Sequence, residues 1–320
     1  MKVLITGSNG FIGQHLVSNL RNEKGISLVL SSRKYVESLS DLAEQFIFSS
    51  IDSSTNWGKV LAGVDTVVHL AGIAHDIKLN FKNSDTKYIE SNIKTTSNLA
   101  KQAVKAGVKR FVYLSSIKVN GEETFINKPF MAEDIPDPQD SYAKSKLNAE
   151  IALKEISKIS DLELVIIRPV LVYGPGVKGN FLNLMKWIKR GIPLPFALIK
   201  NKRDLVSVDN LVNFITICLK HPSAVDQVFL ISDNISLSTK NLIKKIARFQ
   251  KKKIFLLPFP KILLNLVFNL IGRKELSQKL LGSLEVNIQK NINLVGWRPS
   301  QDVDEVLKET VEFFTKYHDI

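Results

Sequence analysis

The chain has 320 residues, of which 44% are hydrophobic, 8% are aromatic and 23% are charged. These ordinary globular proportions exclude a disordered, collagenous or coiled-coil protein, and the length suits one large domain or two closely joined ones. Lysine and arginine number 44 against 31 aspartates and glutamates, which gives a net charge of +13. This excess favours an anionic partner, such as nucleic acid, a membrane surface or a phosphorylated small molecule, without choosing among them.

A single cysteine, Cys218, excludes an internal disulfide and a paired-cysteine zinc or redox motif, so a cytoplasmic location is expected. No metal-ligand spacing occurs, and no metal site is predicted. Residues 1–7 contain too few consecutive apolar residues for a signal peptide and are predicted to begin with a strand. The lysines at 244–245 and 251–253 lack interleaved aromatics and a nucleic-acid motif, so a solvated helix face is the favoured interpretation.

Short apolar runs alternate with helical patterns over the first half of the chain. The predicted strands are 2–5, 28–30, 46–48, 66–70, 110–114 and 164–167, and the predicted helices between them include 12–22, 89–106 and 141–158. Brief apolar runs of this kind suit strands that are buried on both faces. The alternation predicts an α/β fold with a Rossmann-type, doubly wound parallel sheet.

After Pro169 this alternation gives way to segments rich in glycine and proline, at 173–176 and 191–195. Such segments indicate loops beyond the strand ends, where α/β enzymes build substrate sites. One more strand is predicted at 228–232, and an amphipathic helix at 303–317.

The most apolar stretch of the chain is 254–272. Pro258, Pro260 and Lys261 interrupt it before it reaches the roughly 20 residues that a membrane span needs. A buried helix after a loop is therefore expected, and no integral membrane segment.

Glycines recur at every third position after the first predicted strand, in Thr6-Gly7-Ser8-Asn9-Gly10-Phe11-Ile12-Gly13. Between a strand and a helix, this spacing allows a tight turn, close approach of the backbone to a pyrophosphate and close strand-helix packing. The helix N-terminus then faces the anion. The segment predicts a dinucleotide site formed by Gly7, Asn9, Gly10, Phe11, Ile12 and Gly13.

The end of the second predicted strand reads Ser31-Ser32-Arg33 and lacks the acidic residue that usually bonds the ribose hydroxyls of NAD. Arg33 is able to pair with a 2′-phosphate, and Ser32 to hydrogen-bond it. NADP is therefore expected over NAD, which stays open. The alternative is that Arg33 is a solvated loop residue.

Tyr142 and Lys146 are four residues apart on a predicted helix, so both side chains project from one face. A phenol with a pKa of about 10 is a poor base at pH 7, but a nearby ammonium group favours the phenolate. Tyr142 can then exchange a proton with a hydroxyl group whose carbon exchanges a hydride with a nicotinamide. With Ser116 after the fifth predicted strand, these residues form the predicted catalytic set, against the alternative of two surface residues on a helix.

Together, the glycine turn, Ser116 and the Tyr142/Lys146 pair resemble the extended short-chain dehydrogenase/reductase family, in its NAD-dependent epimerase/dehydratase branch. The resemblance covers nearly the whole chain. Its further motifs are His69-Leu70-Ala71-Gly72, Asn92, Arg168-Pro169, Tyr173-Gly174-Pro175, Arg203-Asp204, Val208-Asp209-Asn210-Leu211 and Gly296-Trp297. Histidine is common in the family at the position of His69, and a structural role is expected for it.

The resemblance also implies roles for individual residues. Lys146 holds the nicotinamide ribose and tunes Tyr142, Ser116 bonds the reacting oxygen, and Arg203 pairs with the diphosphate of a sugar nucleotide. The implied cofactor contacts beyond the glycine turn are Ser32, Arg33, Ile51, Leu70, Ala71, Gly72, Asn92, Tyr142, Lys146 and Pro169, and the implied substrate contacts are Ser116, Lys118, Asn180, Phe181 and Arg203. Beside adenine the chain has Ser50-Ile51, where the family often has an aspartate before the aliphatic residue.

The same resemblance implies two domains. The NAD(P)-binding domain covers 1–172, with returning segments at about 203–232 and 303–318, and the substrate-binding domain covers 173–202 and 233–302. The implied partner is a UDP-sugar; no nucleic acid is expected, and a homodimer is left open.

The sequence narrows the reaction to a few alternatives without selecting one. Ile117 and Lys118 follow Ser116 where 4,6-dehydratases of the family carry an acidic residue, which disfavours dehydration. Two reactions at C4 of a UDP-hexosamine-type sugar stay open, 4-epimerisation and reduction of a 4-keto sugar, because 115–122 and 175–181 resemble a bacterial surface-polysaccharide subgroup similar to both. A non-catalytic NADP-binding sensor or scaffold is the alternative of another class, and the intact catalytic set argues against it.

Overall fold

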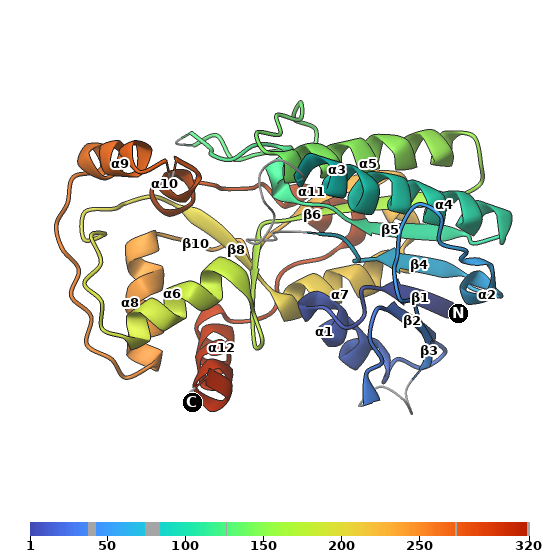
Figure 1. The fold of residues 1–320 in the computed structure, drawn as a ribbon, viewed down its shortest axis with the longest axis horizontal. Helices are drawn as coiled ribbons and strands as arrows, with labels where there is room; N and C mark the ends of the chain where they lie inside the picture. The colour runs from blue at the N-terminus through green and yellow to red at the C-terminus, as the bar shows by residue number, and fades with distance from the viewer. Residues whose placement is uncertain (38–42, 74–83, 126, 273, 319–320) are drawn as a thin grey trace.

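A seven-stranded parallel sheet forms the larger part of the molecule (Figure 1). The computed structural model describes residues 1–37, 43–73, 84–125, 127–272 and 274–318. In spatial order, the strands are β3 (Glu44–Ile47), β2 (Ser27–Ser32), β1 (Lys2–Thr6), β4 (Thr66–His69), β5 (Arg110–Leu114), β6 (Glu163–Pro169) and β9 (Gln227–Ile231). The predicted α/β fold with a Rossmann-type parallel sheet is confirmed.

The strand order reverses between β1 and β4, and in open α/β sheets ligands bind in the crevice at the carboxyl ends of the strands where such a reversal occurs. In the register of the sheet, Thr6 lies beside Ser31 on one side and His69 on the other, and His69 lies beside Tyr113. The residues that follow these strand ends therefore meet at one edge. This edge carries the glycine turn, the end of β2, Ala71-Gly72 and Ser116.

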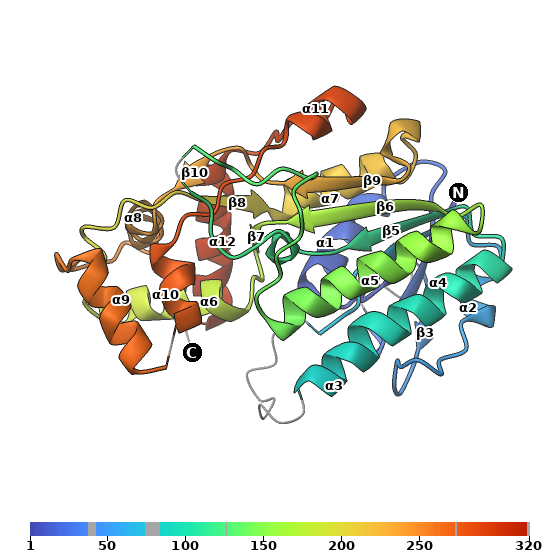
Figure 2. The ribbon, with the colours of Figure 1, turned by 90° about the horizontal axis from the view of Figure 1, so that it is seen from above.

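Helices cover both faces of this sheet, which gives three layers (Figure 2). α1 (Phe11–Leu20) and α7 (Val208–Cys218) pack together on one face, while α2 (Gly58–Leu61), α4 (Thr95–Lys105) and α5 (Ser141–Lys158) cover the other. Strand residues alternate between the two apolar layers, as the uninterrupted apolar runs require. Cys218 lies fully buried in the first layer, so its predicted place in the core is confirmed.

Short helical segments connect the main elements. They are α3 (Ser84–Tyr88), the π-helical η3 (Ile89–Lys94), the 3-10 turns η4 (Ile117–Val119) and η5 (Pro222–Ala224), and α11 (Gln289–Val295). The helix predicted at 89–106 thus begins earlier, at Ser84, and contains one π-helical turn. Such turns often occur at functional sites, and this one carries Asn92.

A second, smaller sheet lies beyond the large one. Its strands are β7 (Leu171–Tyr173), β8 (Arg203–Ser207) and β10 (Ser236–Leu237), with β8 in the centre. Around it stand α6 (Gly179–Lys189), α8 (Thr239–Phe249), α9 (Lys261–Leu270), α10 (Lys274–Leu281) and α12 (Val303–His318), on the left of Figure 1. Their buried side chains form a separate apolar core.

The predicted division into two domains stays a prediction. Of its returning segments, 203–232 contributes β9 to the large sheet and α7 beside α1, while β8 pairs with β7 and β10. In 303–318 the apolar face of α12 packs against α6 and α8. The expected burial of the helix within 254–272 was wrong: the helix exists as α9, but most of its apolar side chains are exposed and only Leu264 is fully buried. α9 packs mainly against α10 and lies at the outer end of the molecule (Figure 2).

Candidate active site

The glycine turn closes tightly against the loop after β4. Gly7 has a φ of +72°, and a Cβ on it would lie 2.9 Å from the backbone nitrogen of Ala71. A Cβ on Gly13 would lie 2.3 Å from the carbonyl oxygen of Gly7. The Gly10 N–H donates to that same oxygen at 2.9 Å. Side chains at positions 7 and 13 would therefore force the turn apart, which explains why glycine is needed there.

The turn leaves the N-terminus of α1 open toward the crevice. Gly10 precedes α1 without a side-chain cap, and the first turn of the helix has no acidic residue. Its N–H groups and positive end are suited to a phosphate group. Within the described residues, the buried Ser31 hydroxyl at the end of β2 has no hydrogen-bond partner. The glycine cradle, the uncapped helix and this hydroxyl fit the pyrophosphate and adenosine portion of a dinucleotide.

Two residues at the end of β2, Ser32 and Arg33, were predicted to bind a 2′-phosphate, and only Arg33 is available for it. The Ser32 hydroxyl donates to the carbonyl oxygen of Lys34 at 2.5 Å, so its proton is committed to the backbone. Arg33 is exposed and remains the candidate partner of a 2′-phosphate. Ile51 is half-buried and packs on the apolar layer beneath the crevice.

Asn92 and Lys146 reach the loop after β4 from two different helical segments. A Cβ on Gly72 would lie 3.0 Å from Oδ1 of Asn92 and 3.5 Å from Nζ of Lys146. The buried Asn92 amide bonds both backbone groups of Ile73, at 2.9 and 3.0 Å, and donates to the Ser145 hydroxyl at 2.9 Å. Asn92 thus joins this loop to α5, and the ammonium group of Lys146 lies close to the same loop.

Lys146 is buried, and its surroundings weaken its charge. Its ammonium donates to the carbonyl oxygen of Leu114 at 2.9 Å and lies 4.7 Å from the centre of the Tyr113 ring. Burial lowers the pKa of Lys146 to about 8, against the opposing effect of Glu150. That carboxylate lies one turn along α5 and accepts two hydrogen bonds from Arg168, at 2.9 and 2.6 Å. This ion pair connects α5 to β6 and so helps to fix the position of Lys146 relative to the sheet.

The Ser116 side chain lies close enough to Tyr142 to lower the pKa of its phenol, so the structure brings these two residues of the predicted catalytic set together. Burial raises the pKa of Tyr142 to about 12, while the Ser116 hydrogen bond and the positive charge of Lys118 lower it. Lys146 was expected to supply the positive charge that lowers the pKa of Tyr142. In the structure, the cation that lowers this pKa is Lys118.

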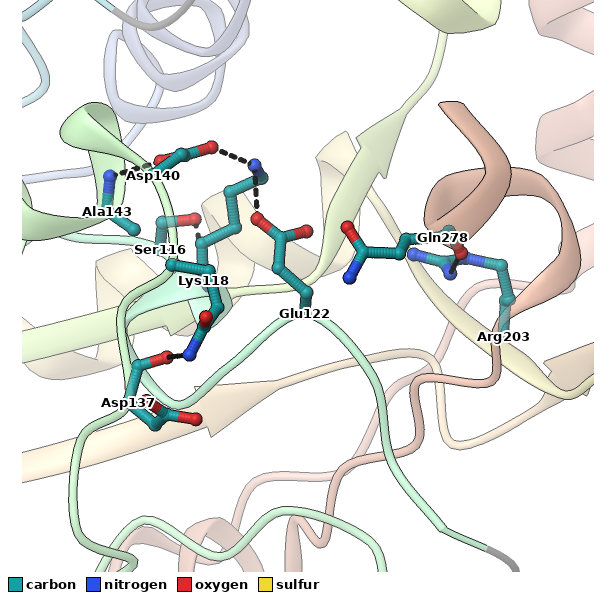
Figure 3. Close-up of polar contacts among 9 residues, drawn as sticks. Ser116, Lys118, Glu122, Asp137, Asp140, Ala143, Arg203 and Gln278 are labelled. Atoms are coloured by element: carbon teal, nitrogen blue, oxygen red, sulfur yellow. Dashed lines mark hydrogen bonds and ion pairs between the residues drawn. The ribbon is translucent and has the colours of Figure 1, made fainter. Parts of the chain in front are cut away.

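Lys118 is held between two carboxylates (Figure 3). Its ammonium donates to Glu122 at 2.7 Å and to Asp140, and the two ion pairs raise its pKa against the effect of burial. Asp140 also caps α5, because it accepts from the Ala143 N–H at 2.7 Å. The loop after β5 is thereby fastened to the helix end that carries Tyr142. Sequence reasoning missed both carboxylates, although an aspartate directly before a helix is a capping signal.

The predicted substrate residues fall into two groups. Arg203 is half-buried and donates to the carbonyl oxygen of Gln278 at 3.2 Å (Figure 3) and to that of Gly282, also at 3.2 Å. Asn180 is exposed at the start of α6. Phe181, however, is only 2% exposed and stacks on Tyr173 with 5.9 Å between ring centres. This burial gives Phe181 a packing role and leaves little of its ring for a ligand.

His69 has the surroundings of a structural residue. Its Nδ1 lies 2.7 Å from the Thr6 hydroxyl and its Nε2 lies 2.9 Å from the Thr96 hydroxyl. Burial lowers its pKa to about 3, so the ring is neutral at physiological pH. Its two hydroxyl partners join β4 to β1 and α4.

Comparisons with known proteins give a consistent result. Residues 3–232 match the model of the NAD dependent epimerase/dehydratase family. A Vibrio cholerae protein named UDP-glucose 4-epimerase is 42% identical over 313 residues, which are 98% of this chain and 95% of the relative. An Escherichia coli O157:H7 protein named N-acetyl-alpha-D-glucosaminyl-diphospho-ditrans,octacis-undecaprenol 4-epimerase is 30% identical over 267 residues, with 81% of this chain and 76% of the relative covered.

Among solved structures, a Bacillus cereus UDP-glucuronic acid 4-epimerase in complex with NAD matches with a TM-score of 0.82. The match covers 99% of both chains at 21% identity, and it establishes the likeness of the folds. The family model and the 42% identical relative carry the assignment of the family. The chain belongs to the NAD-dependent epimerase/dehydratase family, whose members are extended short-chain dehydrogenase/reductase enzymes.

Proposed function

We propose that this enzyme performs NAD(P)-dependent redox chemistry at C4 of a UDP-hexosamine-type sugar, for bacterial surface polysaccharide. The observation that carries the proposal is the assembled set of Ser116, Tyr142 and Lys146 beside the loop at Gly72. The 42% identical relative named UDP-glucose 4-epimerase supports chemistry at C4 of a UDP-sugar. The relative whose name contains an N-acetylglucosaminyl diphosphate supports an amino sugar.

The residues of the set have separable roles in this proposal. A nicotinamide held beside Lys146, Asn92 and Pro169 would supply the acceptor and donor of a hydride. Tyr142 takes the proton of the sugar hydroxyl at its phenolate oxygen and returns it from the phenol. Ser116, which lies beside Tyr142, bonds the reacting sugar oxygen in this proposal. Lys118 favours the phenolate by its charge, and Lys146 bonds the ribose.

The same set serves epimerisation and keto-sugar reduction, which differ in whether the cofactor is exchanged. An epimerase interconverts UDP-N-acetylglucosamine and UDP-N-acetylgalactosamine without added reductant. A reductase consumes NADPH only when a 4-keto-6-deoxy sugar nucleotide is supplied. Chromatography of sugar nucleotides and absorbance at the NADPH band distinguish the two, and an enzyme that is inactive in both assays while it binds cofactor would contradict the proposed function.

NADP is the cofactor that we propose, and Arg33 is the residue that supports it. Arg33→Ala is expected to weaken NADPH binding about 10- to 100-fold, because a 2′-phosphate loses a charge-assisted hydrogen bond. NADH binding should stay unchanged. The matched control is Lys34→Ala, which removes the exposed neighbouring cation. Fluorescence titration measures the six affinities of the wild type and the two variants for NADH and NADPH, and an equal loss for both cofactors in Arg33→Ala would show that Arg33 does not bind the phosphate.

A further inference from the structure

α9 and the segment before it expose an unusual number of large apolar side chains. Ile262 and Leu270 are 84% and 78% exposed. The set, which we call the α9 face, consists of Phe255, Leu257, Phe259, Ile262, Leu263, Leu266, Val267, Leu270 and Ile271. Soluble proteins rarely expose such contiguous apolar surface unless it contacts a partner.

The exposed residues of α9 lie on one side of the helix. Positions 262, 266 and 270 form one row and positions 263, 267 and 271 form the adjacent row, so the apolar side spans about half of the helix circumference. The opposite side faces the protein. There Leu264 joins the apolar core, and Asn265 accepts a hydrogen bond from Ser277 of α10 at 2.5 Å. Figures 1 and 2 both show α9 at the outer end of the molecule, with α10 beside it.

Basic residues border the α9 face. Lys251, Lys252 and Lys253 precede it and Lys261 begins the helix, and all four are exposed. Residues 251–272 contain no aspartate or glutamate, so the segment carries a charge of +4. Its partner must therefore accept apolar side chains and also be anionic. A second copy of the chain docked through the same face would bring four more lysines against these, which disfavours self-association.

A bilayer surface with anionic lipids has both properties. Exposed lysines beside an apolar helix side are the pattern of helices that lie in the membrane interface, where apolar side chains enter the acyl boundary and lysines attract acidic headgroups. Among the described residues, no helix is long and apolar enough to cross a membrane. The 10 residues of α9 extend about 15 Å, a length that suits a helix lying flat.

We propose that the α9 face docks this enzyme on the surface of a bilayer that contains anionic phospholipid. The inference goes beyond the proposed function and does not depend on it. It has a consequence for the site, since α9 packs on α10 and the carbonyl oxygens of Gln278 and Gly282, at the end of α10 and just beyond it, hold Arg203. Docking would thus bring the substrate side of the molecule close to the membrane surface.

Vesicle flotation of the full chain tests the proposal. Vesicles of phosphatidylcholine with phosphatidylglycerol are expected to carry the protein upward, vesicles of phosphatidylcholine alone much less, and added salt should weaken the binding. The double variant Ile262→Glu/Leu270→Glu is expected to lower the partition coefficient at least about 100-fold, because two side chains no longer enter the acyl boundary. Lys251→Glu/Lys252→Glu/Lys253→Glu should lower it by at least about fivefold per lysine.

The matched control is Ile135→Glu/Ile159→Glu, which changes side chains that are 90% and 87% exposed outside the α9 face. This variant should bind vesicles like the wild type, and the melting temperatures of all variants should agree. The proposal is overturned if the wild type does not float at low salt or if the α9 and control variants bind equally. It is also overturned if light scattering shows a dimer that Ile262→Glu/Leu270→Glu dissociates, because the face then binds a second copy. None of these measurements uses catalytic turnover, so a failure of the proposed reaction leaves the result intact.

Discussion

Tyr142→Phe is expected to lower kcat about 10²- to 10⁴-fold, the usual contribution of a general acid-base group. The substitution removes the oxygen that we propose exchanges a proton with the sugar and whose pKa is lowered by the neighbouring Ser116 side chain. It keeps the aromatic ring, which packs near Tyr88 with 6.1 Å between ring centres. The Kd of the cofactor should therefore change little. Steady-state kinetics and a fluorescence titration of the cofactor measure the two quantities separately.

Tyr113→Phe is the matched control for this experiment. Tyr113 also lies next to the site, in β5, but its buried hydroxyl has no hydrogen-bond partner within the described part of the chain. Removing an unpartnered buried hydroxyl costs no hydrogen bond, so turnover and the melting temperature should both be kept. Wild-type turnover in Tyr142→Phe, or an equal loss in the two variants, would show that the proton is exchanged elsewhere.

Much of the fold could be predicted because its signals are local. Apart from the edge strand β3, the strands of the large sheet are short, mostly apolar runs that are largely buried, and each run is visible in the sequence. The placement of α12 could not be predicted in this way. Its amphipathic pattern shows that one face is buried but does not say whether the large sheet or the helices α6 and α8 bury it. The expected burial of α9 was wrong for a related reason. Apolar side chains are buried only when another element covers the helix, and the sequence does not show whether one does.

In the candidate site, too, the features that local sequence determines could be predicted, whereas the contacts between distant residues could not. The glycine turn and the spacing of Tyr142 and Lys146 follow from local geometry, and the structure brings Ser116 to Tyr142 and Lys146 to Gly72. The pairing of Lys118 with Asp140 joins residues 22 positions apart in the sequence, so no local pattern reveals it. Only the structure shows which charges surround Tyr142. Because of them, Lys118 and not Lys146 is now expected to control the pKa of the phenol.

Lys146→Met is expected to weaken cofactor binding about 10- to 100-fold, because the ribose loses a charge-assisted partner. The ammonium donates one hydrogen bond to the carbonyl oxygen of Leu114, and its remaining protons are available for ribose hydroxyls. Methionine keeps the length of the side chain. Burial lowers the pKa of Lys146 to about 8, so in the cofactor-free enzyme the charge is present below that pH and lost above it. Wild-type affinity should fall as the pH rises through about 8, and the methionine variant should not show this fall.

Lys118→Met separates the two lysines, because its expected effect is on proton transfer. Without the Lys118 charge the phenolate of Tyr142 is less stable, so the pKa of Tyr142 rises further above its ordinary value. The rising limb of the plot of kcat against pH should then move to higher pH, while cofactor affinity stays close to that of the wild type. Asp140 raises the pKa of Tyr142 as well, and the variant leaves that carboxylate without its lysine partner, which adds to the shift in the same direction. The opposite result, in which Lys146→Met moves the pH profile and Lys118→Met does not, would contradict this assignment. It would show that Lys146, beside the bound cofactor, lowers the pKa of Tyr142.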